Sequence, residues 1–206
     1  MSSEEFAEIT GVSRETLASL DQYLALLRRW QTAINLVGPR TLTDPWRRHL
    51  LDSAQLVQYL PNDADDIFDL GSGAGLPGLI LAIVSDSKVH LVESDLRKAQ
   101  FLREAARVLG LPVEVHAARI EQLPARCANV IVARALAPLH RLIDLAFPLL
   151  KADSICLFLK GQKLQDELTE ARKSWRMSSQ SFPSLSDPSA SVLKLWDIER
   201  APLHRQ

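Results

Sequence analysis

A run of glycines that follows an acidic residue is the part of this chain with the clearest chemistry. Asp69 ends a short apolar segment, and a second apolar segment follows the glycines at residues 79–84. This order predicts a strand, a tight turn and a helix, with Pro77 in the first turn of that helix. Because glycines let a ligand approach the backbone and helix starts carry free N–H groups, the turn predicts a binding site. The glycines of the run are Gly71, Gly73, Gly75 and Gly78.

The acidic residues near these glycines indicate the type of ligand. The pattern Gly-x-Gly-x-x-Gly also fits a dinucleotide site, and Glu93 stands about 20 residues further on, as that pattern requires. However, a carboxylate at Asp69 would repel a pyrophosphate and favour a ligand with positive charge. S-adenosylmethionine carries an ammonium and a sulfonium group and no phosphate, and Glu93 could accept hydrogen bonds from its ribose. We therefore favour S-adenosylmethionine, with a nicotinamide-dependent oxidoreductase as the alternative.

Length and composition exclude several classes of protein. A chain of 206 residues with 47% apolar and 24% charged residues suits one globular domain with a substantial core. No apolar run reaches the roughly 20 residues of a membrane span, and the acidic N-terminal segment is not typical of a signal peptide. Two cysteines without Cys-x-x-Cys spacing predict no disulfide framework and no metal site. We expect a cytoplasmic monomer without membrane association. Because the net charge is −1, any RNA-binding surface must be a local cluster of basic residues.

The order of apolar patterns predicts an α/β fold. Helical patterns fill residues 1–60, with one helix that starts after Ser13 and a second that runs from Asp44-Pro45 to about residue 60. Strands and helices then alternate, which predicts a mainly parallel sheet with an antiparallel C-terminal hairpin. We therefore expect a helical extension at 1–60 and a Rossmann-like domain at 61–206, packed as one unit. The predicted strands are 67–70, 89–93, 113–116, 130–133, 155–160, 175–182 and 192–198.

Polar residues fall at the C-terminal ends of these strands, where open α/β sheets bind ligands. They are Asp69, Glu93, Arg134 and Lys160. The Asn/Asp-Pro-Pro-aromatic turn of many amine methyltransferases is absent after residues 130–133, where Arg134-Ala135 stands instead. Other short motifs lie along the whole chain: Trp30 with Asn35-Leu36, Arg48-His49-Leu50-Leu51-Asp52-Ser53, Gly75-Leu76-Pro77-Gly78, Lys98 with Phe101-Leu102, Arg119-Ile120-Glu121 and Leu159-Lys160-Gly161.

With these motifs the chain resembles the bacterial 16S rRNA guanine-N7 methyltransferases, the RsmG or glucose-inhibited division protein B family, which have the class I S-adenosylmethionine-dependent fold. One departure is Val37, where the family usually has Thr. The resemblance implies that the partner is 16S rRNA of the small ribosomal subunit and that the product is 7-methylguanine in its decoding-region loop. It implies cofactor contacts at Gly71, Leu76, Ile120, Glu121 and Arg134, and basic contacts to substrate at Lys98, Arg119 and Lys160.

Methylation at guanine N7 needs no general base, because the lone pair attacks the sulfonium methyl directly. We expect catalysis by positioning, with Arg134 orienting guanine through O6 and Asp52 stabilising the positive charge on the purine. His49 could contact substrate, or it could form a structural pair with Asp52. Plainer alternatives are a solvated helix face at Lys98 and a surface pair between Arg119 and Glu121. A small-molecule methyltransferase, or a binding protein without activity, stays open as a function.

Overall fold

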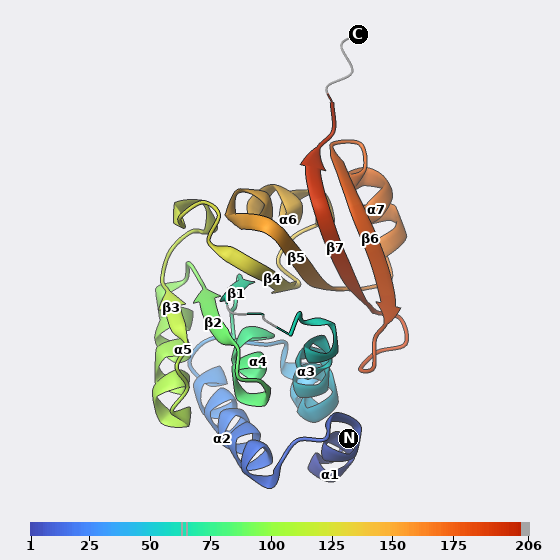
Figure 1. Cartoon of the computed structure of the whole chain (residues 1–206). Coiled ribbons are helices and arrows are strands. Elements are labelled where there is room, and N and C mark those ends of the chain that lie inside the picture. The colour runs from blue at the N-terminus through green and yellow to red at the C-terminus, as the bar shows by residue number, and fades with distance from the viewer. Residues whose placement is uncertain (63, 65, 203–206) are drawn as a thin grey trace.

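A seven-stranded sheet in the order β3-β2-β1-β4-β5-β7-β6 forms the centre of the computed structural model, which describes residues 1–62, 64 and 66–202 (Figure 1). The first five strands pair in parallel, and β7 pairs antiparallel with both β5 and β6. The prediction of a mainly parallel sheet with an antiparallel C-terminal hairpin is confirmed. The strands are β1 (Asp66–Leu70), β2 (Lys88–Val92), β3 (Glu114–His116), β4 (Ala128–Arg134), β5 (Leu150–Lys160), β6 (Trp175–Pro183) and β7 (Ser191–Arg200).

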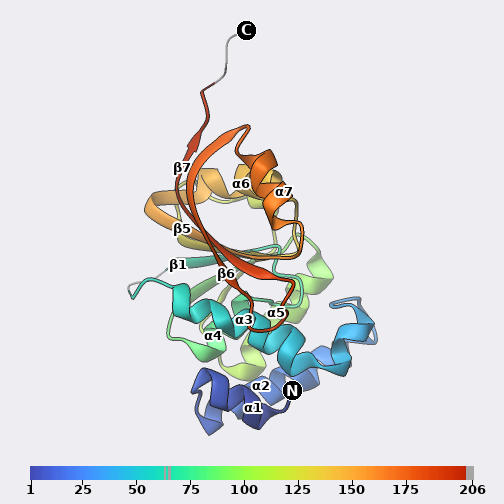
Figure 2. The ribbon, with the colours of Figure 1, turned by 90° about the vertical axis from the view of Figure 1, so that its right-hand side faces the viewer.

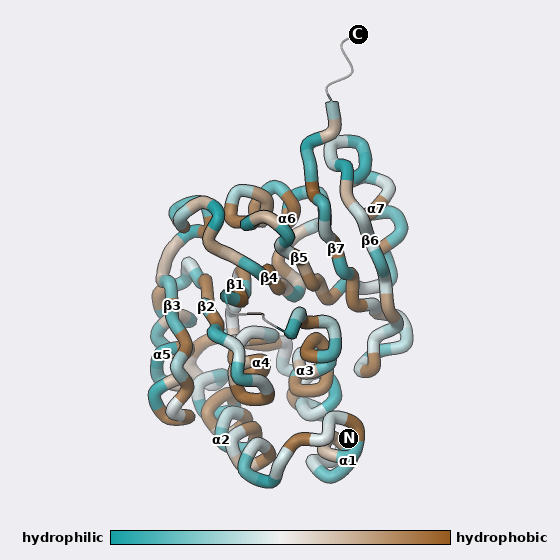
Figure 3. The backbone as a smooth tube through the Cα atoms, in the orientation of Figure 1, coloured by the Kyte–Doolittle hydropathy of each residue, from teal (hydrophilic) through white to brown (hydrophobic). Residues whose placement is uncertain are grey.

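Helices cover both faces of the sheet, because alternate strand residues point to opposite sides. Ile67 of β1 packs with the N-terminal helices, α4 and α5, whereas the next residue, Phe68, packs with α6 and α7. Figure 2 shows these two layers on either side of the sheet, and Figure 3 shows apolar residues along the central strands. These helices are α4 (Gly78–Val84), α5 (Leu96–Leu109), α6 (Leu139–Ala146) and α7 (Leu164–Ala171).

The N-terminal segment is helical, as expected, but its helices differ in detail from the prediction. Helix α1 (Ser3–Thr10), which precedes the two helices that we placed within the extension, begins with a capping box between Ser2 and Glu5. Helix α2 (Arg14–Gln31) is capped by Ser13 and ends before the expected Gly38-Pro39. It ends because the Gln31 side chain satisfies the following backbone, since its Oε1 accepts from Leu36 N at 2.9 Å and Val37 N at 3.0 Å.

The second expected helix is continuous in the chain but changes its pitch twice. It follows a 3₁₀ turn, η1 (Pro39–Thr43), and passes through a π-helical, an α-helical and a 3₁₀ segment. Its core residues share one hydrophobic cluster with the sheet, so the extension packs directly onto the rest of the chain. Within the described ranges, no helix is both long and apolar enough to cross a membrane. The three segments are η2 (Trp46–Leu51), α3 (Asp52–Ala54) and η3 (Gln55–Tyr59).

Candidate active site

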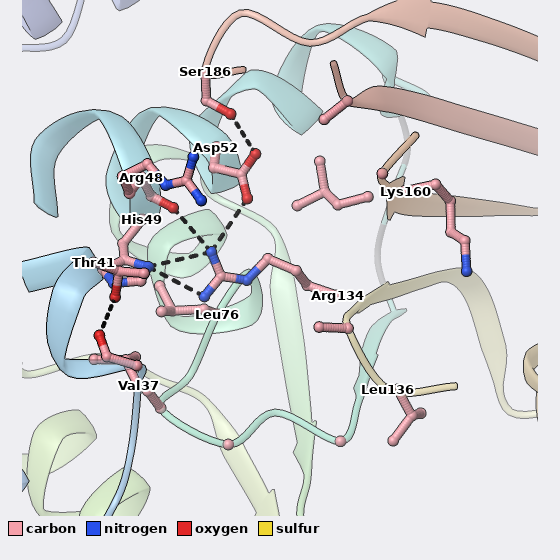
Figure 4. A pocket seen from close by; sticks show the side chains of 18 of the residues that line it. Val37, Thr41, Arg48, His49, Asp52, Leu76, Arg134, Leu136, Lys160 and Ser186 are labelled. Atoms are coloured by element: carbon pink, nitrogen blue, oxygen red, sulfur yellow. Dashed lines mark hydrogen bonds and ion pairs between the residues drawn. The ribbon is translucent and has the colours of Figure 1, made fainter. Parts of the chain in front are cut away.

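A cavity of about 730 Å³ lies beyond the C-terminal ends of β1, β4 and β5 (Figure 4). This is where the strand order reverses direction between β1 and β4, which is the usual ligand position in such sheets. Its volume is within the range of about 300–1,000 Å³ that is common for ligand sites. The predicted site residues that line the cavity are His49, Asp52, Gly71, Gly73, Leu76, Arg134 and Lys160.

The glycine turn forms one wall of the cavity. Gly73 has a φ of +54°, and a Cβ added there would have only Gly71 O within 4 Å, at 3.8 Å. The backbone at Gly73 therefore leaves room for a ligand. Gly78 is needed for a different reason, because a Cβ added there would lie 2.7 Å from Asp69 Oδ2. Only glycine lets the start of α4 pack this closely against β1.

The free N–H groups that we expected at the start of α4 are instead bonded within the turn. Gly78 N donates to Asp69 Oδ2 at 3.0 Å, and Leu79 N donates to Gly75 O at 2.8 Å. Pro77 lies just before the helix as its N-cap and not in its first turn. The turn therefore offers an open backbone and nearby acids to a ligand, and not a row of free donors.

Asp69 lies beneath the turn and does not line the cavity. Its side chain is fully buried, and Oδ1 has no hydrogen-bond partner among the described residues. Burial raises the pKa of this carboxyl to about 7, against the opposing effect of the Gly78 N–H bond. Positive charge brought close to Asp69 would favour its ionised form.

Glu93 follows β2 directly and holds the turn from the other side. Its Oε2 accepts from Gly73 N at 2.9 Å, and its Oε1 accepts from Asp95 N at 2.8 Å. Each carboxylate oxygen can accept a second hydrogen bond, so Glu93 keeps capacity for ligand hydroxyls.

A hydrogen-bond network centred on Arg134 forms the opposite part of the cavity lining (Figure 4). Its Nη1 donates to Arg48 O at 3.1 Å and to Asp52 Oδ2 at 3.2 Å. Both Nη1 and Nη2 lie 3.3 Å from His49 Nδ1. His49 and Asp52 do not bond to each other, and each bonds separately to Arg134, so the alternative of a structural pair between them is not found.

This network fixes the tautomer of His49. Because Nδ1 accepts from Arg134, the ring hydrogen must be on Nε2, which lies 2.7 Å from Thr41 Oγ1. Thr41 in turn donates to Gly38 O at 2.6 Å. Burial, followed by the charges of Arg134 and Arg48, lowers the pKa of His49 to about 4. His49 is therefore neutral at pH 7, and both ring nitrogens are occupied.

Several residues of this site had no role in the sequence prediction. Ser186 and Asp187 lie in the hairpin loop (residues 184–190) that joins β6 to β7. Ser186 Oγ donates to Asp52 Oδ1 at 2.6 Å, and Asp187 Oδ2 pairs with Arg48 Nη1 at 3.1 Å. Ser186 and Asp52 are 134 positions apart, and no local pattern reports such a contact. Tyr23 on α2 was also missed, although its hydroxyl donates to Ala74 O in the glycine turn at 2.8 Å.

Apart from Lys160, the remaining predicted basic and acidic residues are not brought together at the cavity. Lys160 lines it, but its amine pairs with Glu167 of α7. Glu121 pairs with Arg141 at 3.4 Å and not with Arg119, so the alternative of a surface pair between residues 119 and 121 is wrong. The predicted site residues outside the cavity lining are Asp69, Gly75, Glu93, Lys98, Arg119, Ile120 and Glu121.

The fold, with its glycine turn and strand-end acid at the reversal point, is that of class I S-adenosylmethionine-dependent methyltransferases. A methyltransferase of this kind from Aquifex aeolicus has a TM-score of 0.57 at 17% identity, covering 76% of this chain and 95% of its own. M. jannaschii TYW2, solved in complex with AdoMet, has a TM-score of 0.57 at 15% identity, covering 82% of this chain and 80% of its own.

The sequence identifies the family more closely. The family model of rRNA small subunit methyltransferase G, GidB, matches residues 16–193. A protein of that name from Rhodospirillum rubrum is 52% identical over 98% of this chain and 100% of its own length, and one from Rhodospirillum centenum is 55% identical over 94% and 90%. The chain belongs to this family. The expected resemblance is confirmed, as is the expectation of a methyltransferase that uses S-adenosylmethionine.

Proposed function

We propose that this chain transfers the methyl group of S-adenosylmethionine to N7 of a guanine in the decoding-region loop of 16S rRNA. The observation that carries the proposal is the single cavity lined by both the glycine turn and the Arg134 network. One wall is suited to the cofactor, and the other presents fixed hydrogen-bonding groups to a planar base. The relatives named rRNA small subunit methyltransferase G support rRNA as the substrate class.

The residues present fit the cofactor. S-adenosylmethionine supplies an electrophilic methyl group on a positively charged sulfur. The buried Asp69, with one unpartnered oxygen, gives this part of the chain a preference for positive charge. Glu93 would accept hydrogen bonds from the ribose, and the open backbone at Gly73 would allow close approach. We place Ile120 and Glu121, in the turn after β3, at the adenine end.

The chemistry at N7 requires positioning and not proton removal. Guanine N7 offers a lone pair, and the methylated product has no proton on N7 to lose. His49 could not readily act as a base, because both of its nitrogens are engaged and its pKa is lowered to about 4. Arg134 would orient the base through O6, a frequent arginine contact, and Asp52 would stabilise the positive charge that develops on the purine.

Basic residues outside the cavity would bind the rRNA backbone. Lys98 is half-buried at the first turn of α5, and Arg119 is exposed after β3. Phosphate contacts of this kind position the nucleic acid without reading its sequence. Lys160, held by Glu167, would act at the cavity itself.

Methylation of defined substrates tests the proposal. The protein is incubated with labelled S-adenosylmethionine and either small ribosomal subunits or free 16S rRNA, and the modified nucleoside is identified by mass spectrometry. We expect 7-methylguanosine at one position and stabilisation of the protein by S-adenosylhomocysteine but not by NADH. Methylation of another base or atom would refute the N7 assignment. Activity on small molecules that does not weaken with salt would instead favour a small-molecule enzyme.

A further inference from the structure

Three polar side chains gather at the edge of the sheet, outside the cavity lining. His90 lies on β2, and Glu114 and His116 lie on the edge strand β3. The parallel register pairs His90 with Glu114, and Glu114 and His116 are two positions apart on one strand. The side chains of residues two apart point to the same face of a sheet. The register therefore brings a nitrogen from each histidine and a carboxylate to one point.

The distances between these atoms match those of a metal site. His90 Nδ1 lies 3.1 Å from His116 Nε2 and 3.3 Å from Glu114 Oε2, and His116 Nε2 lies 3.7 Å from Glu114 Oε1. Zinc binds such ligands at about 2.0–2.2 Å in tetrahedral geometry, which places two ligand atoms about 3.3 Å apart. The 3.1 Å contact is a hydrogen bond in this structure, and one ion could reach all three side chains once the ring hydrogen of His116 moves from Nε2 to Nδ1.

The surroundings of His90 hold its ring in the orientation that such a site needs. Asp66 Oδ1 lies 3.4 Å from His90 Nε2, which favours the hydrogen on Nε2 and leaves the lone pair on Nδ1. A carboxylate behind a ligating histidine is a common feature of zinc sites. The Phe68 ring stacks on His90 at 4.2 Å between centroids, with 7° between the planes. Lys151 Nζ donates to Asp66 Oδ2 at 2.8 Å and holds this carboxylate in place.

We propose that His90, Glu114 and His116 bind one zinc ion, with water completing the tetrahedron. The ion would fix the short edge strand β3 to β2. By holding His116, the ion would also steady the backbone of Glu93, because His116 O accepts from Glu93 N at 3.0 Å. The spacing of the cysteines, from which we expected no metal, gives no sign of a site built from histidine and glutamate on two strands.

Metal titration of the full chain, after treatment with a chelator, tests this proposal. We expect one equivalent of Zn²⁺ to bind and, at about 100 times its Kd, to raise Tm by roughly 5–10 °C. Co²⁺ in the same site should give the visible absorption of a tetrahedral ion with nitrogen and oxygen ligands. His116→Ala and Glu114→Gln should each weaken Zn²⁺ binding at least tenfold. His140→Ala, which removes an exposed histidine on α6, is the matched control and should bind as the wild type does.

Three results would overturn the proposal: less than one equivalent bound by the wild type, unchanged affinity in the two ligand variants, or a sulfur-to-cobalt charge-transfer band. The last would place the ion on a cysteine. Glu114→Gln decides the matter if His116→Ala does not fold, because the Glu114 side chain is 61% exposed and its amide analogue keeps the same shape.

Discussion

Replacing Arg134 with alanine tests the central feature of the cavity, the single cation that joins β4 to the N-terminal helical segment. The variant removes hydrogen bonds to Arg48 O, His49 Nδ1 and Asp52 Oδ2. We expect methyl transfer to fall far more than stability does, because the partners can still be solvated or bonded elsewhere while the base loses its fixed position.

The size of each effect follows from these contacts. The Arg134 side chain is only 19% exposed, but Asp52 keeps its bond from Ser186, so we expect a loss of about 1–3 kcal/mol in the free energy of unfolding. For a chain of this length that corresponds to a fall in Tm of about 2–12 °C. A displacement of about 1 Å at a reacting centre can lower the rate roughly 100-fold, and we expect at least this loss in the single-turnover rate of methyl transfer.

Single-turnover methylation of 16S rRNA, below the Tm of every variant and at saturating S-adenosylmethionine, measures the rate. Circular dichroism measures folding in the same samples. Arg107→Ala removes an exposed arginine that pairs with Glu104 at 2.8 Å on the outer face of α5, and should match the wild type in both assays. Arg134→Lys should restore little activity, because an ammonium group cannot reproduce the planar fork. A folded Arg134→Ala protein with a rate within about threefold of the wild type would refute this reasoning.

Three further predictions concern the turn and the hairpin loop. Glu93→Gln should weaken S-adenosylhomocysteine binding about 10- to 100-fold by calorimetry, since hydrogen bonds to a charged acceptor are lost, and a change below about threefold would contradict this role. Asp69 binds its proton more tightly in the folded state, so its contribution to stability is lost as pH rises from about 4 through 7. Asp69→Asn should therefore flatten the fall in Tm of the ligand-free protein between about pH 5 and 8, and equal slopes for the two proteins would count against the raised pKa. Asp187→Asn weakens the ion pair with Arg48, and it should raise KM for rRNA while changing Tm by less than about 2 °C. An unchanged KM would exclude a role for the hairpin loop in substrate binding.

Much of the fold could be predicted because its signals are local. Apolar runs mark the buried parallel strands, and Ser13 marks the start of the helix that the structure contains as α2. The strand-end position of Arg134 and Lys160 follows from the order of strands alone, and both residues line the cavity.

The parts that could not be predicted depend on contacts between distant segments. Nothing near Asp52 indicates Ser186, and nothing near Arg48 indicates Asp187. The bond from Gly78 N to Asp69 Oδ2 was missed for a similar reason, because the spacing of the glycines does not show that the turn satisfies its own donors. Spacing along the sequence shows which residues share one face of a helix or strand, but it does not show which distant residue each side chain contacts.

The topology of the sheet has a consequence for the order in which the pocket is completed during folding. Strand β7 is the last of the described strands along the sequence, yet it lies between β5 and β6. The loop that bonds to Asp52 and Arg48 can settle only when this final strand is in place. The lining of the pocket is therefore complete only after the β6–β7 hairpin has paired with β5.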